Sequence, residues 1–550
     1  TGSTVEEWDT MIYLKDTSSP QEYDQAIFRL QNQYIKEYIN NDNDIIKYNM
    51  KPQTLLVDFD PYRMFILQEQ KSKIYNVNIE ESGNSLLEER LKKELRISPI
   101  ITMNKNKIIE IEPKNIIDAV SEYSKEKGVM DEVNDIPVDL KILNYTEIKR
   151  VIDIQAELGT NKGLATDNVD DEDGEELEIP EIDIEISERQ EEKDIKEDEK
   201  NDDETVIYEK KIRTYFARIL FYSFLTEDKV NSLLQIISSI DNNEENKSIA
   251  KNLGLNNNIL KIMNEKMDAF KLSQLDYKIH NINKLSQDNT LKPLERAKVA
   301  MNKFKKLSQS EIITPIKTCK NMINLINKNK IVEICKSKGK ILDIASKMGE
   351  FTTAMYEILT EIKIDKKDFE NIIYAIPTSS IAYEFTKKIY KILGLNSENI
   401  AKQFNTYDLL KVLDNKGKID YKKIKRYLCQ DKKFSEIKLE ENLIYREEDE
   451  KMKFDIIVGN PPYQEIVSTS KKNASLGKQL FPWFIISTMK LKPKYSTLIT
   501  PSRWFTGDAQ DKSFVKLREY IKENNHISKI YNYKDEKEVF DNVEIKGGIN

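Results

Sequence analysis

The sequence of 550 residues is poor in histidine and cysteine. It has two histidines, His280 and His526, and three scattered cysteines, Cys319, Cys335 and Cys429. No two cysteines have the Cys-x-x-Cys spacing of a zinc site, and cysteines so few and so dispersed cannot form a disulfide framework. The composition therefore excludes a disulfide-stabilised fold and argues against a His/Cys zinc site. We expect no metal ion.

Long apolar runs are also lacking. No stretch approaches the ~20 consecutive apolar residues that span a bilayer, and no basic segment followed by an apolar run opens the chain. The 16 glycines and 15 prolines are too few for a linker-dominated chain, whereas hydrophobic residues, at 39%, can fill real cores. At ~150 residues per domain the length predicts three or four domains. We expect a cytoplasmic protein without a membrane segment.

A phosphate-binding loop of the form G-x-x-x-x-G-K-[ST] does not occur in the sequence. The pairs Gly339-Lys340, Gly417-Lys418 and Gly477-Lys478 lack both the spacing and the hydroxyl residue that follows the lysine. We therefore expect that the chain cannot hydrolyse ATP by itself.

The net charge of -8 is unevenly distributed. Residues 166–205 hold 21 Asp and Glu against 4 Lys and Arg, a local charge of -17, so the other 510 residues carry +9. A block this acidic repels itself and cannot bury enough apolar surface to offset the entropy of ordering. We interpret it as a disordered acidic linker. A mimic of DNA phosphates that occupies a basic groove is an alternative interpretation.

Residues 1–75, upstream of this linker, have the pattern of a strand, a helix and a second strand. A short apolar strand at residues 11–14 ends in a Ser-Ser-Pro turn, and residues 54–60 (TLLVDFD) predict a buried strand. Between them, apolar residues recur at helical spacing, at Tyr23, Ala26, Ile27 and Leu30.

This segment resembles the end of the second motor lobe of a superfamily 2 helicase, a RecA-like lobe. Thr1-Gly2 followed by Trp8-Asp9 is similar to the fifth helicase motif, and Gln25-x-x-x-Arg29 is similar to the sixth. Such motors use a glutamine and arginines to stabilise charge on the transferring phosphoryl group. Asn32 replaces the family's second arginine. The nucleotide contacts that the resemblance implies are Thr1, Gly2, Gln25 and Arg29.

A complete motor would need a first lobe before Thr1, in a longer polypeptide. The alternatives are a generic α/β fragment and, for the initial Thr-Gly-Ser, a cloning scar.

The middle of the chain carries no chemical motif. Residues 76–165 are a mixed connector, and residues 206–304 are predicted to be a helical coupler. One apolar helix face consists of Ile207, Ile212, Phe216, Ile219, Leu220 and Phe224. Pro293 begins a later helix, because proline is tolerated in a first helical turn. The inward residues of this helix are Ala297, Ala300, Phe304 and Leu307.

Chemistry is concentrated in residues 305–550. Residues 338–359 (KGKILDIASKMGEFTTAMYEIL) predict a strand with Asp343 at its tip, a turn with Gly349, and a helix. This layout lets a backbone approach a cofactor at the carboxyl end of a parallel strand. A second strand at 371–376 precedes another helix, and a third loop spans 405–408. The alternation predicts a doubly wound, mostly parallel α/β sheet.

The sequence MKFDIIVGNPPYQE (452–465) places Asn460-Pro461-Pro462-Tyr463 directly after an apolar strand. The prolines fix φ and carry no N–H, so the loop is stiff and the Pro461 carbonyl is held outward. The Asn460 amide oxygen lies beside it in sequence, and two converging acceptors suit the two N–H donors of an exocyclic amine. Tyr463 offers a ring on which an extruded base can stack. A plain Pro-Pro turn does not explain these features together.

Residues 305–550 resemble the adenine-specific amino-methyltransferases of restriction-modification systems, which use S-adenosylmethionine. Besides NPPY, SEIITPIKTCKNMI (310–323) looks like the family's cofactor-covering segment and TLITPSRWFTG (497–507) like its later strand and loop. The arrangement with a helicase-like start resembles single-chain restriction enzymes that fuse a translocase, a helical coupler and a methyltransferase. The resemblance implies a class I methyltransferase fold.

The same resemblance implies site roles. The catalytic residues would be Asn460, Pro461, Pro462 and Tyr463, and methyl transfer to a flipped adenine in double-stranded DNA would be direct, without a general base. Asp343 would orient the amino-acid end of the cofactor, and Asp408 would accept from its adenine amine. The cofactor-binding set is Thr314, Pro315, Asp343, Ala345, Gly349, Phe351 and Asp408.

Two positions depart from the family. Lys347 replaces the first loop glycine, and Pro377 stands where an acid normally binds the ribose hydroxyls. The alternatives are therefore a DNA motor or nuclease subunit whose methyltransferase fold only binds DNA, an amino-methyltransferase acting on cytosine, and a small-molecule or protein methyltransferase.

Sequence recognition is expected to lie elsewhere. The chain ends within what looks like a late strand of the catalytic sheet, so we expect the target-recognition region to be missing. DNA binding would then be weak, without sequence preference and strongly salt-dependent.

Overall fold

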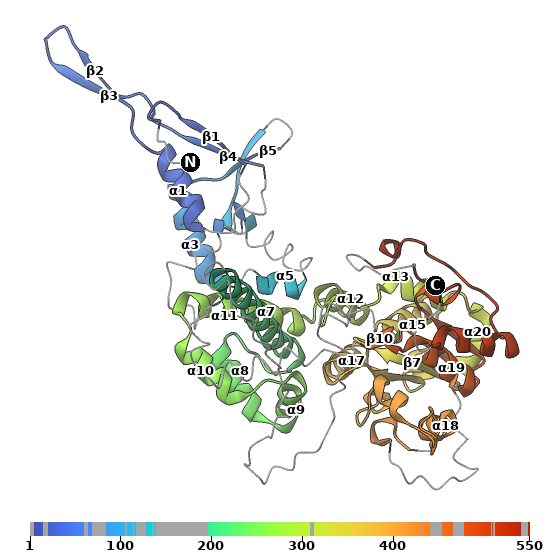
Figure 1. Cartoon of the computed structure of the whole chain (residues 1–550). Coiled ribbons are helices and arrows are strands. Elements are labelled where there is room, and N and C mark those ends of the chain that lie inside the picture. The colour runs from blue at the N-terminus through green and yellow to red at the C-terminus, as the bar shows by residue number, and fades with distance from the viewer. Residues whose placement is uncertain are drawn as a thin grey trace. The chain divides into compact units, whose positions relative to one another are not determined.

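The computed structural model describes residues 5–14, 20–59, 64–65, 67–68, 84–104, 107–113, 115–116, 128–134, 136, 138, 196–307, 313–430, 432–439, 454–465, 478–507, 509, 512–540 and 548–550. The chain divides into two compact units. Unit 1 comprises Thr1–Pro137 with Asp268–Gln274, and unit 2 comprises Val138–Met267 with Leu275–Asn550. Figure 1 shows the elements of both units along the chain.

Unit 1 contains the strand, helix and strand predicted near the amino end. Strand β1 (Thr10–Tyr13) pairs in parallel with β4 (Leu55–Asp58), and α1 (Pro20–Leu30) lies between them in sequence. Tyr13 of β1 and Tyr23 of α1 meet edge to face, with ring centroids 5.0 Å apart. The expectation of a buried strand at 54–60 is only partly correct, since Leu55 is 46% exposed. Within the described residues β1 and β4 form a sheet of two strands, which leaves β4 incompletely covered.

The other elements of unit 1 are mixed. Strands β2 (Ile35–Ile39) and β3 (Ile45–Asn49) form an antiparallel hairpin, as do β5 (Ile101–Asn104) and β6 (Lys107–Glu110). The helices are α3 (Asn84–Ile97) and α5 (Val129–Asn134).

Unit 2 begins with the long helix α7 (Lys196–Leu225). Residues 196–205, which the charge pattern assigned to a disordered linker, are therefore helical. Their lysines and glutamates are good helix formers that extend a helix nucleated by packing further along. The rest of the acidic segment lies outside the described residues. The expected single apolar face also needs correction, because residues 215–217, 219–222 and 224 are each at most 1% exposed, which buries this stretch of the helix on all sides.

Five further helices follow α7. They are α8 (Leu233–Asn242), α9 (Glu244–Leu253), α10 (Asn257–Lys266), α11 (Ala269–Gln287) and α12 (Pro293–Lys303). Side-chain caps begin three of them, since Ser232, Asn243 and Asn256 each accept a hydrogen bond from the first turn of the helix that follows. Pro293 opens α12 as expected, and the four residues predicted to point inward are buried: Ala297, Ala300, Phe304 and Leu307.

A parallel sheet forms the centre of the rest of unit 2, which confirms the predicted α/β class. Its strands are β7 (Lys340–Ser346), β8 (Ile373–Pro377), β9 (Phe454–Gly459) and β12 (Tyr495–Leu498), in the order β12-β9-β7-β8. All neighbouring strands are parallel. Helices α13 (Ile316–Ile323) and α14 (Lys328–Lys336) precede β7. Two further short strands, β10 (Gln464–Glu465) and β11 (Lys478–Gln479), pair antiparallel.

The connections between the strands are helical. Between β7 and β8 lie α15 (Glu350–Glu361) and α16 (Lys366–Phe369). Between β8 and β9 lie α17 (Ser380–Leu393), η3 (Ser397–Asn399), η4 (Thr406–Lys411), α18 (Tyr421–Leu428) and η5 (Phe434–Glu436). Helix α19 (Phe481–Leu491) precedes β12, and η8 (Ser502–Trp504), α20 (Ser513–Glu523) and η9 (Glu536–Glu538) follow it.

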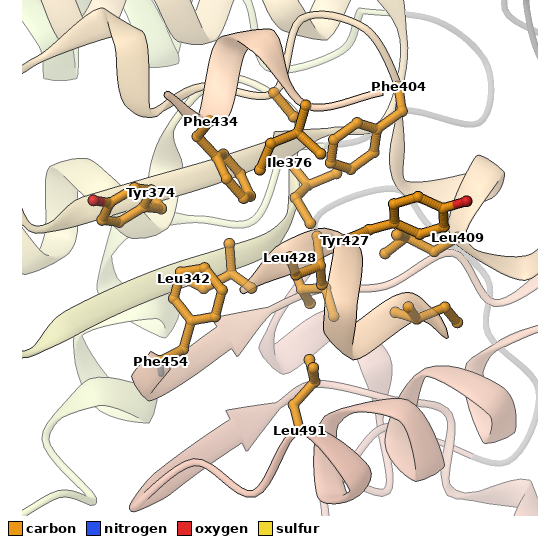
Figure 2. Close-up of a cluster of buried hydrophobic side chains, with 14 of the residues drawn as sticks. Leu342, Tyr374, Ile376, Phe404, Leu409, Tyr427, Leu428, Phe434, Phe454 and Leu491 are labelled. Atoms are coloured by element: carbon orange, nitrogen blue, oxygen red, sulfur yellow. The ribbon is translucent and has the colours of Figure 1, made fainter. Parts of the chain in front are cut away.

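Helices cover both faces of the sheet. One face packs into a core that includes Leu342 of β7, Ile376 of β8 and Phe454 of β9, together with residues of α18 and α19. Figure 2 shows this core, with Tyr427 and Leu428 of α18 and Leu491 of α19 among the labelled side chains. Helices α15 and α17 contact β7 but contribute no residue to this core, so they cover the opposite face.

The helical region packs against α17. Phe385 of α17 lies 5.2 Å from Phe221 of α7 and 5.0 Å from the Phe304 ring, measured between centroids. The Lys388 side chain, also on α17, donates to Glu227 at 3.0 Å. The second connection of the sheet is thus joined to the helices that precede the sheet.

Candidate functional site at the carboxyl edge of the sheet

The Asn-Pro-Pro-Tyr loop follows β9, which lies between β12 and β7. Gly459, the last residue of β9, lets this strand approach the end of β7 closely, because a Cβ at this position would be 2.9 Å from Ile344 Cγ2. Asn460 and Pro461 are buried, and Pro462 and Tyr463 are half-buried. The stiff loop expected from the prolines therefore begins at the carboxyl edge of the sheet.

The side chain of Asn460 contacts a residue that sequence reasoning assigned to a different role. Its Nδ2 donates to Thr314 Oγ1 at 3.0 Å. Asn460 is 4% exposed and Thr314 is fully buried. Thr314 and the exposed Pro315 lie just before α13, in the segment predicted to cover a cofactor. The structure thus brings this segment directly onto the catalytic motif.

Tyr463 packs beside α19. Its ring lies edge to face with Phe481 at 6.4 Å between centroids, against a core that also contains Trp504 and Phe514. Its hydroxyl is buried, has no hydrogen-bond partner among the described residues, and its pKa is raised by this burial. The ring rather than the hydroxyl is therefore the part of Tyr463 that is available for recognition.

Two residues that the sequence did not identify brace the far end of this loop. Strand β10 directly follows Tyr463, and the Leu480 N–H, just after β11, donates to the Tyr463 carbonyl at 3.0 Å. Arg503 Nη2 donates to Gln479 Oε1 at 2.6 Å. Arg503 belongs to TLITPSRWFTG, which drew attention as a segment only. Burial lowers the pKa of its guanidinium, and the neighbouring Tyr463 opposes that shift.

The loop between β7 and α15 has the predicted strand, turn and helix. Gly349 has φ = 76°, in the left-handed region that favours glycine, and is the N-cap residue of α15. Its N–H donates to Ser346 Oγ at 3.1 Å. Glu350 Oε2 accepts from the Met348 N–H at 2.9 Å and from the Lys347 N–H at 3.3 Å. Glu350 closes the turn in which Lys347 replaces the usual glycine.

Two acidic side chains are buried together beside this turn. Asp343 is 1% exposed and Glu350 is fully buried. Burial raises the pKa of Asp343 well above its ordinary value, and the Glu350 carboxylate raises it further. Burial also raises the pKa of Glu350, against the opposing effect of Lys347. Asp343 Oδ2 and Glu350 Oε1 have no hydrogen-bond partner among the described residues. A bound cation or N–H donor would stabilise their ionised forms.

The third predicted loop also reaches the carboxyl edge. Thr406 Oγ1 lies 3.0 Å from the carbonyl oxygen of Ile344 and 3.2 Å from that of Ile376, which ties the loop to the ends of β7 and β8. Asp408 is half-buried, accepts from the Asn405 N–H at 2.9 Å and pairs with Lys411 at 2.9 Å. Its carboxylate is thus already partly engaged.

The structure therefore gathers most of the predicted site residues at one edge of the sheet. Ala345 and Phe351 are fully buried there, one at the end of β7 and the other in the first turn of α15. Pro377 ends β8 opposite Ser346. The predicted nucleotide contacts are separate from this edge: Gln25 and Arg29 are exposed positions on α1 in unit 1, and Thr1 and Gly2 lie outside the described residues.

Searches of the described residues for two further features found none. No group of three or more His, Cys, Asp or Glu side chains there is arranged to hold a metal ion. No helix in the described part of the chain is both long and apolar enough to cross a membrane.

Comparison with known proteins identifies relatives of part of the chain. An uncharacterized adenine-specific methylase of Mycoplasma pneumoniae is 39% identical over 98 residues, 18% of this chain and 22% of that protein. The type II restriction enzyme and methyltransferase RM.Eco57I of Escherichia coli is 25% identical over 256 residues, 39% of this chain and 25% of that protein. The chain thus spans about a quarter of the length of these curated relatives.

Solved structures give weaker likenesses. The DrdV–DNA complex matches 92% of this chain and 50% of that chain at 11% identity and a TM-score of 0.37. A nuclease-deletion mutant of the type ISP restriction-modification enzyme LlaGI, in complex with a DNA substrate mimic, matches 56% and 30% at 12% identity and a TM-score of 0.33. Scores this low do not establish a shared fold.

The family comparison covers the sheet and the loop after β9. Residues 371–540 match the Eco57I restriction-modification methylase family, and they include β8, β9 and the Asn460-Pro461-Pro462-Tyr463 loop. This confirms the resemblance found in the sequence. Residues 371–540 form an Eco57I restriction-modification methylase domain.

Proposed function

We propose that this chain is a DNA methyltransferase that transfers a methyl group from S-adenosylmethionine to the exocyclic amino nitrogen of a flipped adenine, as part of a restriction-modification system. The observation that carries the proposal is the placement of Asn460 and Pro461 at the carboxyl edge of the sheet. There the Asn460 amide is held by Thr314, and the stiff Pro-Pro backbone follows directly. The names of the curated relatives point to the same chemistry.

The residues present fit the cofactor. Asp343 Oδ2 and Glu350 Oε1 are buried oxygens without a hydrogen-bond partner among the described residues, which suits a ligand that brings an ammonium group. The turn at Gly349 begins α15 beside them, and Asp408 lies in the neighbouring loop. Asp343, Gly349 and Asp408 would hold the ligand, with Glu350 supporting the turn. When bound, S-adenosylmethionine supplies an electrophilic methyl group.

The ribose contact is the part of this fit that departs from the family. Pro377 has no side chain that could bind hydroxyls. Glu384, the next acid along α17, is 3% exposed and accepts from Asn252 Nδ2, so it does not replace the missing carboxylate. This departure supports the alternative of a methyltransferase fold that only binds DNA.

The chain's own residues would act on the base. Asn460 Oδ1 and the Pro461 carbonyl accept the two amine hydrogens and direct the nitrogen lone pair along the line of transfer. The Tyr463 ring stacks on the extruded base and offsets part of the cost of unstacking it. The amine proton leaves after the new bond forms, so no base with a tuned pKa is needed beforehand.

The amino-terminal unit is a second part of the proposal. The parallel pair of β1 and β4, with α1 between them in sequence, supports a helicase-derived lobe in residues 1–75. Double-stranded DNA is the partner that both parts imply.

Transfer of a labelled methyl group tests this function. The full chain is incubated with labelled S-adenosylmethionine and mixed-sequence duplex DNA, and the modified base is then identified by mass spectrometry. We expect N6-methyladenine from the parent and none from Asn460→Ala, while both proteins bind the cofactor equally well. N4-methylcytosine would point to cytosine as the target. Cofactor binding or DNA binding without any transfer would support the binding-only alternative.

A further inference from the structure

Two Xaa-Pro segments that lie far apart in sequence meet at the site. Thr314-Pro315 precedes α13 and Asn460-Pro461 follows β9, 146 residues later. A residue before proline is restricted to extended backbone conformations. Both side chains therefore leave backbones that have little freedom to adjust.

The surroundings of Thr314 restrict it further. It is fully buried, and its carbonyl accepts from the Cys319 thiol on α13 at 3.7 Å. The preceding residue, Ile313, donates its N–H to the Lys305 carbonyl at 3.0 Å. A β-branched side chain has few χ1 rotamers, so the Thr314 hydroxyl occupies a nearly fixed position.

This fixed hydroxyl decides which end of the Asn460 amide faces the substrate. The terminal torsion of asparagine is soft and has two broad wells, which exchange the oxygen and the NH2 group. Donation from Nδ2 to Thr314 Oγ1 selects the well in which Oδ1 points elsewhere. No described residue donates a hydrogen bond to Oδ1 in the structure. The opposite orientation would turn two N–H donors toward an amine that is itself a donor.

We infer that Thr314 is a positioning residue for methyl transfer: by accepting from Asn460 it keeps Oδ1 turned toward the target amine. The inference rests on the proposed function. It assigns Thr314 to the base side of the site, in addition to the place near the cofactor that the sequence suggested.

The test compares Thr314→Val, which keeps the shape and removes the acceptor, with Thr314→Ser, which keeps the hydroxyl. We expect Val to lower kcat for methyl transfer about tenfold, the value of one hydrogen bond, and Ser to restore most of it. KM for DNA and the Kd for S-adenosylmethionine, measured by equilibrium binding without DNA, should stay within about twofold of the parent.

A matched control is Thr488→Val on α19. Thr488 is 1% exposed, and its hydroxyl has no hydrogen-bond partner among the described residues, so its loss should leave kcat unchanged. An unchanged kcat in Thr314→Val, with an active parent and an inactive Asn460→Ala, would overturn the positioning role and leave the proposed function standing. A weakened cofactor Kd with unaltered kcat at saturation would also overturn it. Lack of transfer by the parent itself would overturn both.

Discussion

The Glu384 carboxylate on α17 accepts a hydrogen bond of 2.5 Å from the Asn252 side chain on α9. Both residues lie in unit 2, one in the methylase domain and the other in the helical region. Burial raises the pKa of Glu384, so the Asn252 amide compensates a carboxylate that has lost much of its water. The helix that follows β8 is thus held by specific polar contacts as well as by aromatic packing.

Glu245, also on α9, makes this junction sensitive to acid. Its carboxylate pairs with Lys391 and Lys387 of α17, at 2.6 and 2.9 Å. These contacts lower its pKa from the ordinary value of 4.5 to about 2. Because the folded-state pKa is depressed, the stabilisation is present above pH 4.5 and is lost as pH falls toward 2.

We therefore predict that Glu245→Gln lowers the melting temperature at pH 7 by about 1–3 °C, a modest effect because the pair is partly exposed. The difference from the parent should shrink between pH 4.5 and pH 2, as measured by scanning fluorimetry at low salt. Glu244→Gln is the matched control, since Glu244 pairs with Lys247 within α9. A difference that stays constant with pH would contradict the assignment.

Gly459 is the second position with a sharp prediction. A Cβ there would be 2.9 Å from Ile344 Cγ2 and 3.5 Å from the Ala345 nitrogen, so Gly459→Ala must displace the end of β9 and the loop after it. We expect a loss of stability of about 1–3 kcal/mol, as for other overpacked sites, and a marked fall in kcat for methyl transfer.

Gly417→Ala separates the two effects. Gly417 has φ = 71° and no neighbouring atom within 4 Å, so alanine there is strained but clashes with nothing. It should lower the melting temperature and leave kcat unchanged. Equal kcat values for the two alanine variants would show that the position of the NPPY loop does not depend on the approach of β9 to β7.

The parts of the fold that the sequence predicted are those written in local patterns. The β8 strand at residues 373–377 and the turn at Gly349 follow from apolar runs bounded by a glycine or a polar residue, and proline marks the start of α12. Asn460 could be found because its chemistry is carried by four consecutive residues.

The missed features depend on contacts between distant residues. Nothing near Thr314 in sequence indicates that its hydroxyl meets Asn460, and nothing near Arg503 indicates that it braces Gln479. Glu350 follows Gly349 directly, and an acid at a first helical turn is an ordinary helix-start signal. Its burial beside Asp343 is set by the tertiary fold. The all-round burial of α7 likewise depends on helices that follow it in the chain.

Tyr463 supplies the last prediction, which separates its ring from its hydroxyl. The hydroxyl has no hydrogen-bond partner among the described residues, and burial keeps its pKa above the ordinary range, so it stays protonated at neutral pH. Tyr463→Phe should therefore keep kcat within about twofold. Tyr463→Ala should lower kcat/KM for DNA by at least tenfold, because stacking on one base contributes about 1–3 kcal/mol.

The control for Tyr463→Ala must remove a ring from the same core without touching the loop. Tyr520 packs against that core from α20, so Tyr520→Ala reports the cost of lost packing alone. We expect it to lower the melting temperature by a similar amount and to leave kcat/KM close to the parent value. If Tyr463→Phe lost as much activity as Tyr463→Ala, the hydroxyl would be the acting group and base stacking would not be the role of this ring. Steady-state methyl transfer on one duplex, at saturating S-adenosylmethionine, measures all four proteins under the same conditions.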